Sequence, residues 1–101
     1  MTKTELRGLL NELGRSPTAI AKSLEAKGIR GWKGSCALCP LAVYLKSQGA
    51  PMAEVSRGDI CIRNGPDAGD DIAVRPTKSV KEFIERFDDG MFPALDKAKK
   101  P

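Results

Sequence analysis

The spacing of the apolar residues changes at Pro51, and this change limits the folds that the chain can adopt. Before Pro51 the apolar residues recur at intervals of three and four, the period of an amphipathic helix. After it they alternate with polar residues, as in a strand with one buried face, until a helical period returns near residue 76. The sequence therefore predicts an α+β fold: three N-terminal helices, a short β-hairpin of two to three strands, and a C-terminal amphipathic helix.

Two helices are expected within the first 28 residues. Thr2 and Glu5 have the spacing of a capping box, and Gly14 supplies a stop for the first helix. Ser16 is the candidate N-cap of the second helix, which we expect to end at Gly28. The apolar stripe of the first helix consists of Leu6, Leu9, Leu10 and Leu13.

A third helix is expected to begin at Pro40, with Cys39 as its N-cap, and to end near Gly49. Proline suits the first helical turn because the backbone N–H that it lacks has no partner there. The segment is apolar on nearly every side, so we expect it to be the central and most buried helix.

Residues 59–75 are predicted to form a hairpin whose tip is the turn-rich stretch 64–70, after a short extended segment at Val55. So few strands are not stable alone and must lie against the helices. The fourth helix opens near Thr77, with Ser79 as a competing N-cap. Its apolar stripe consists of Val80, Phe83, Ile84 and Phe87.

A chain of 101 residues has room for one domain. We expect a single compact domain over residues 1–95, with 91–95 turning two side chains back to the core, and a frayed basic tail over 96–101. No apolar run approaches the roughly 20 residues of a membrane span, and the first residues do not resemble a signal peptide. We therefore expect a cytoplasmic protein with no membrane partner.

The net charge of +4 is concentrated in the first half of the chain. Residues 1–50 carry eight Lys and Arg against three acidic residues, whereas residues 51–101 carry nine against ten. This asymmetry favours a partner with an acidic surface, either a protein or a nucleic acid. A solvated basic face without any partner gives the same composition.

The glycine-rich loop of residues 28–35 is the main candidate site. Trp32, the only Trp, lies between Arg30 and Lys33, and Trp and Arg are residue types that dominate binding at protein interfaces. Trp32 is equally compatible with a role as a lid over the core. The glycine N–H groups and two cations would also suit an anion, although the spacing is neither a P-loop nor a dinucleotide fingerprint. The expected binding residues are Arg15, Lys22, Lys27, Arg30, Trp32 and Lys33.

The first two helices and their tight turn allow an alternative function, nucleic-acid binding by a helical hairpin of the helix-turn-helix type. The side chains at the start of the second helix would then face the base edges. They are Thr18, Ala19, Lys22 and Ser23.

Three cysteines and no histidine give a second alternative, a zinc or thiol-redox site at Cys36, Cys39 and Cys61. Structural zinc takes four ligands, and a thioredoxin-like Cys-x-x-Cys follows a strand, so neither site is complete here. We favour packing of Cys39 and Cys61 as small apolar side chains, with no metal and no cofactor. Without a histidine base or a serine in a nucleophile-elbow setting, we expect no enzymatic activity.

The segment Cys36-x-x-Cys39-Pro40-Leu41-Ala42-x-Tyr44-Leu45, after Gly-Ile-Arg-Gly, resembles a family of small uncharacterised proteins of actinobacteria and their bacteriophages. The similarity extends over the hairpin and over residues 80–90, and thus over most of the chain. The resemblance implies a compact cytoplasmic accessory protein, encoded by a phage or another mobile element, that binds a host component rather than catalysing a reaction. It assigns no role to any single residue.

Overall fold

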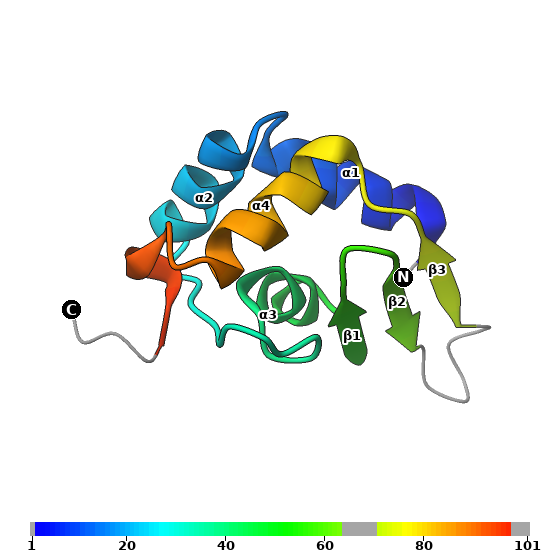
Figure 1. Cartoon of the computed structure of the whole chain (residues 1–101). Coiled ribbons are helices and arrows are strands. Elements are labelled where there is room, and N and C mark those ends of the chain that lie inside the picture. The colour runs from blue at the N-terminus through cyan, green and yellow to red at the C-terminus, as the bar shows by residue number, and fades with distance from the viewer. Residues whose placement is uncertain (1, 64–70, 98–101) are drawn as a thin grey trace.

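A computed structural model of the chain describes residues 2–63 and 71–97 (Figure 1). Its elements are α1 (Lys3–Leu13), α2 (Pro17–Ala26), α3 (Pro40–Ser47), β1 (Met52–Val55), β2 (Ile60–Arg63), β3 (Ile72–Val74), α4 (Lys78–Asp88) and a short 3₁₀ turn, η1 (Pro93–Leu95). The predicted α+β fold is therefore confirmed, with three strands and a C-terminal helix.

The elements form two layers (Figure 1). Helices α1, α2 and α4 lie above, whereas α3 and the sheet lie below with β1 beside α3. The apolar stripes predicted on α1 and α4 face the interior between the layers, as the burial of Leu6, Leu10, Phe83 and Phe87 shows. This arrangement leaves the loop between α2 and α3 on the lower face of the molecule.

The sheet is antiparallel, with strand order β1-β2-β3. Its register places Val55 opposite Ile60 and Ile60 opposite Val74, and all three side chains are buried. Cys61 alternates with them and is only half-buried, as predicted from the period of two. The predicted hairpin tip, residues 64–70, lies outside the described residues.

The helix N-caps follow the sequence prediction. Thr2, Ser16 and Cys39 each accept a hydrogen bond from the backbone N–H three residues further on. Helix α4 is capped by Thr77, whose hydroxyl accepts from a backbone N–H at 3.3 Å. The competing candidate Ser79 has a different role, because its hydroxyl donates to the Arg15 carbonyl and joins α4 to the turn between α1 and α2.

The segment after α4 returns to the core, as expected. The Phe92 ring stacks on Phe83 with 5.4 Å between ring centroids, and Leu95 is buried. The prediction of a frayed tail from residue 96 is wrong at its start: Asp96 is 2% exposed, and the Lys97 N–H donates to the Gly31 carbonyl at 2.9 Å. Asp96 pairs with Gly31, 65 residues earlier in the chain. Such a non-local contact cannot be predicted from the charge pattern of the tail.

Candidate interaction surface

The loop between α2 and α3, residues 28–39, begins at a regular helix end. The Gly28 N–H donates to the Glu25 carbonyl and the Ile29 N–H to the Leu24 carbonyl, both at 3.0 Å. With a φ of 71° at Gly28, this is the Schellman ending expected from the sequence. It turns the chain away from α2 and downward toward α3 (Figure 1).

Gly31 fixes the middle of the loop. Its N–H donates to the Leu95 carbonyl at 2.8 Å and its carbonyl accepts from Lys97, so the loop and the C-terminal segment form a parallel bridge. A Cβ at Gly31 would collide with the backbone of residues 38–40. The loop thus passes through a slot that only a glycine fits, and its backbone is held on both sides.

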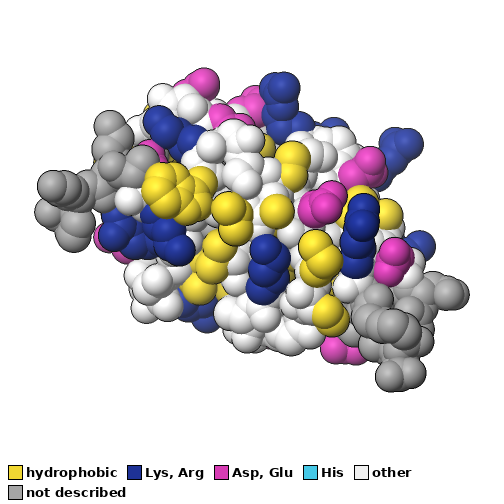
Figure 2. Space-filling model, turned by 90° about the horizontal axis from the view of Figure 1, so that it is seen from below, with side chains coloured by type: hydrophobic (Ala, Val, Ile, Leu, Met, Phe, Trp, Pro, Cys, Tyr) yellow, Lys and Arg dark blue, Asp and Glu magenta, His cyan; other side chains and the backbone are white. Residues whose placement is uncertain are grey.

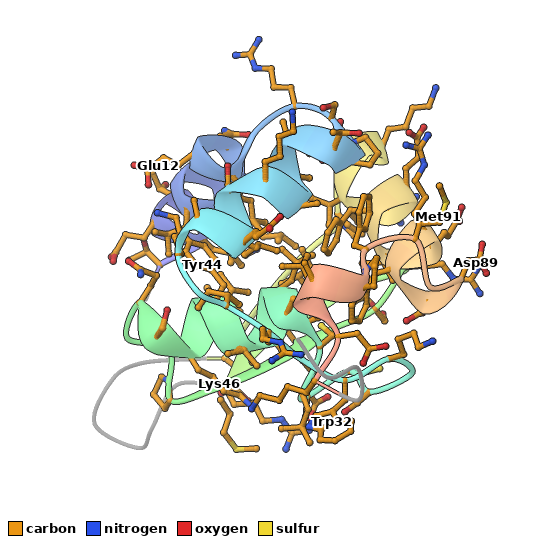
Figure 3. The ribbon with its side chains drawn as sticks, turned by 90° about the vertical axis from the view of Figure 1, so that its left-hand side faces the viewer. Glu12, Trp32, Tyr44, Lys46, Asp89 and Met91 are labelled. Atoms are coloured by element: carbon orange, nitrogen blue, oxygen red, sulfur yellow. The ribbon has the colours of Figure 1, made fainter. Side chains whose placement is uncertain are left out.

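Two large apolar side chains protrude from this fixed backbone. The Trp32 N–H donates to the Leu38 carbonyl at 2.8 Å, which places the two residues next to each other at the base of the loop. Trp32 is 44% exposed and Leu38 is 49% exposed. Figure 3 shows Trp32 on the lower edge of the molecule, away from the core, so a role as a core lid is not what the structure shows.

The two cations that flank Trp32 are drawn back toward Asp96. The Arg30 guanidinium donates to the Asp96 backbone carbonyl at 2.7 Å, and the Lys33 amine lies 3.7 Å from an Asp96 carboxylate oxygen. Arg30 is half-buried as a result, whereas the Lys33 side chain is still 37% exposed. Asp96 could not be predicted as part of this site, because no local pattern in the sequence connects it to the loop.

The loop glycine N–H groups that would suit an anion are engaged within the chain. The Gly31 N–H is used by Leu95, and the Gly34 N–H donates to the Asp88 carboxylate at 3.2 Å. Both donors thus bind acceptors of the chain itself, and one of these acceptors is the carboxylate of Asp88.

The remaining predicted binding residues lie apart from Trp32. Arg15 belongs to the turn between α1 and α2, at the top of Figure 1, whereas the loop lies at the bottom. Lys22 is exposed on α2. The Lys27 amine lies 6.0 Å from the centroid of the Tyr44 ring, a cation–π distance that attaches Lys27 to α3. The structure therefore groups Arg30, Trp32 and Lys33 and separates Arg15 from them.

The helical hairpin offers few groups for reading bases. The Ser23 hydroxyl donates to the Leu13 carbonyl at 2.7 Å and is already engaged within the fold. On the outer face of α2, Lys22 is accompanied by the acidic Glu25, and both are exposed. The charges of Lys22 and Glu25 cancel, so this pair gives the outer face of α2 no excess positive charge. The structure therefore adds no support for the nucleic-acid alternative.

The three cysteines occupy different environments. Cys36 is exposed, while Cys39 and Cys61 are half-buried. Cys39 packs against the hydrophobic core, as expected of a small apolar side chain. The Cys39 sulfur accepts from the Ala42 N–H at 3.5 Å, and burial is the main cause that raises the pKa of its thiol. Within residues 2–63 and 71–97 no three His, Cys, Asp or Glu side chains lie in a group that can hold a metal ion.

Comparisons of the chain with protein-family models, with curated proteins and with solved structures give no match. Among the described residues, no helix is both long and apolar enough to cross a membrane. The resemblance to actinobacterial and phage proteins stays a prediction.

Proposed function

We propose that the protein is a non-enzymatic interaction module that binds a partner protein through Trp32, Leu38 and Lys33 on the loop of residues 28–39. The observation that carries this proposal is the exposure of two large apolar side chains on a backbone that is fixed on both sides. Because the loop is already ordered before binding, association costs less conformational entropy. Trp is also among the residue types that contribute most to protein interfaces.

The charge around the loop favours an acidic partner. Between Glu25 and Glu54 the sequence has no acidic residue and four basic ones, Lys27, Arg30, Lys33 and Lys46. The fold brings Asp96 next to Lys33 and Asp88 next to Gly34, so the excess positive charge rests mainly on the other three. Figure 2 shows the lower face of the molecule, where hydrophobic side chains form a broken band. Lys and Arg side chains lie beside its left-hand part, and both signs of charge lie beside its right-hand part. A fitting partner presents an apolar groove with carboxylates on its rim, since this complements both features.

The proposed setting follows the resemblance noted in the sequence: a cytoplasmic accessory protein of a phage or mobile element that binds a host component. The binding surface does not depend on this setting, because it rests on exposure and charge alone.

The experiment that tests the proposal uses Trp32 as its reporter, since the chain has a single Trp. Peptides selected from a random displayed library on the immobilised protein are titrated into the wild type, Leu38→Ser and the matched control Met91→Ser. Met91 is 59% exposed, follows α4, and lies apart from Trp32 in Figure 3. We expect selected peptides to combine Asp or Glu with large apolar residues and to shift the Trp32 emission to shorter wavelength.

The expected affinity loss is about tenfold or more for Leu38→Ser and less than about twofold for Met91→Ser, as for a central against a remote contact. Equal binding by the two variants would contradict the proposal. So would selected peptides without acidic residues. Duplex DNA that shifts the Trp32 emission at about 50 mM salt, with affinity falling steeply as salt rises, would favour the nucleic-acid alternative instead.

A further inference from the structure

A small apolar pocket lies beside the interaction loop, between the turn of residues 35–39, the end of β1 and helix α4. Its volume is about 190 Å³, and both Cys36 and Cys39 line it. Arg57 and Asp88 are the charged residues in its wall. Its apolar wall includes Val55, Phe83, Ile84 and Phe87. Packing alone does not account for the pair of thiols, because Cys36 is exposed rather than enclosed by the core.

The backbone around the two cysteines is a single helical turn. The Cys39 N–H donates to the Ser35 carbonyl at 3.1 Å, and the Leu38 N–H donates to the Ser35 hydroxyl, also at 3.1 Å. Residues three apart in such a turn have Cα atoms roughly 5 Å from each other, which is within the range that a disulfide requires. The Cys36 carbonyl accepts from the Val55 N–H at 2.8 Å, which holds the turn against β1.

The two thiols differ in a way that separates their roles. Cys36 is open to solvent, whereas Cys39 is half-buried at the N-terminus of α3. Burial raises the pKa of the Cys39 thiol, and the nearby Cys36 adds to this shift. An incoming disulfide therefore meets the exposed sulfur of Cys36 first, and the Cys39 sulfur stands behind it.

We infer that Cys36 and Cys39 form a redox-active dithiol that exchanges with small disulfides of the glutathione type. The Cys36 thiolate attacks one sulfur of the added disulfide, which forms a mixed disulfide and releases one glutathione thiolate. Cys39 then loses its proton and attacks the Cys36 sulfur, which closes the Cys36–Cys39 bond and releases the second thiolate. Two electrons pass from the cysteines to the added disulfide, and the two protons end on the two released thiols.

This inference does not depend on the proposed function, since it concerns the thiols rather than Trp32 and Leu38. The test uses the folded full-length chain, equilibrated with mixtures of reduced and oxidised glutathione and then alkylated. Trypsin releases both cysteines in one peptide, residues 34–46. We expect this peptide to lose two hydrogens and to resist alkylation as the oxidised fraction rises, and the Cys61 peptide to stay free and reactive.

Variants separate the two steps. Cys39→Ser is expected to accumulate the glutathione adduct on Cys36, and the matched control Cys61→Ser to close the disulfide as the wild type does. Alkylation of Cys39 in Cys36→Ser is expected to be about tenfold slower or more than that of Cys36 in Cys39→Ser, because the buried thiol is less accessible. The inference is wrong if the wild-type peptide 34–46 keeps two free thiols in excess oxidised glutathione, or if disulfides form only between chains.

Discussion

Gly28, Gly31 and Gly34 have equal spacing in the sequence and different roles in the structure. Gly28 supplies the left-handed residue that ends α2, and the Gly34 N–H binds the Asp88 carboxylate. Position 31 requires glycine because the backbone of residues 38–40 occupies the space where a Cβ would lie. The spacing predicted a loop with accessible N–H groups, whereas the structure uses these groups to fix the loop.

The first prediction compares two glycines with opposite surroundings. Gly31→Ala is expected to destabilise the fold by about 1–3 kcal/mol, since the new methyl group meets backbone that cannot rotate away. Gly8→Ala is the matched change: apart from the backbone of α1 itself, no atom lies within 4 Å of the new Cβ, and Gly8 is exposed. It is expected to stabilise by about 0.5–1 kcal/mol because alanine favours the helix. Urea unfolding followed by circular dichroism measures both, and equal midpoints would show that the slot at Gly31 does not exist.

At the scale of elements, local signals located the helices and strands well. Thr2, Ser16 and Cys39 were identified as N-caps because capping depends on residues only three positions apart. The alternation of Ile60 and Ile62 with Cys61 gave the buried face of β2. The interaction surface was only partly predictable, because the sequence shows which residue types lie in a loop and not which backbone they pair with. Leu38 was missed because it was assigned to no element and its neighbour Trp32 lies six residues earlier.

Two groups at helix α3, its N-cap Cys39 and Tyr44 within it, have raised pKa values. Burial raises the pKa of the Cys39 thiol from its ordinary value of 9.0. Burial, and to a lesser degree the Glu12 carboxylate, raises the pKa of the Tyr44 hydroxyl from 10.0 (Figure 3). Above these ordinary values the unfolded chain releases protons that the folded chain retains, so the free energy of unfolding falls as the pH rises.

The second prediction is therefore a loss of stability on the alkaline side, centred on α3. Urea midpoints measured under reducing conditions are expected to fall as the pH rises above about 9. Cys39→Ala is expected to be less stable at neutral pH, because it removes the cap and some packing, but to show a shallower decline. Cys61→Ala is the matched thiol substitution and is expected to keep the decline of the wild type. A profile that is as steep in Cys39→Ala as in Cys61→Ala would exclude the Cys39 thiol as a cause.

At the scale of the whole molecule, the interaction loop is held in place by the opposite end of the described chain. Asp96 joins the two segments through its backbone carbonyl to Arg30 and through its carboxylate to Lys33. Leu95 and Phe92 pack this segment against the hydrophobic core. Because the loop is bonded to the segment, the core also holds the loop in place. A surface that looks local in the sequence thus depends on contacts across the complete fold.

The last prediction concerns the ion pair at this junction. Asp96→Asn keeps the backbone bond to Arg30 and removes the charge next to Lys33, whose side chain is 37% exposed and can turn to water. It is expected to destabilise by about 1–3 kcal/mol. Lys33→Met is expected to cost more, because it takes a cation away from a carboxylate that is only 2% exposed. Glu82→Gln is the control, since its pair with Lys78 lies on the exposed surface of α4, and we expect a change below about 0.5 kcal/mol.

Acrylamide quenching of Trp32 supplies the second measurement for the same variants. Asp96→Asn and Lys33→Met are both expected to increase the quenching constant of Trp32. Each variant removes the ion pair that helps to hold the loop next to Asp96. Glu82→Gln is expected to leave the quenching constant unchanged, since the start of α4, where Glu82 pairs with Lys78, lies at the top of Figure 1 and the loop lies at the bottom. If Asp96→Asn is destabilised while Trp32 quenching stays at the wild-type value, the ion pair stabilises the fold without ordering the loop. The preorganised surface would then rest on Gly31 and its backbone bridge alone, and Gly31→Ala would be the variant in which partner binding and Trp32 quenching change together.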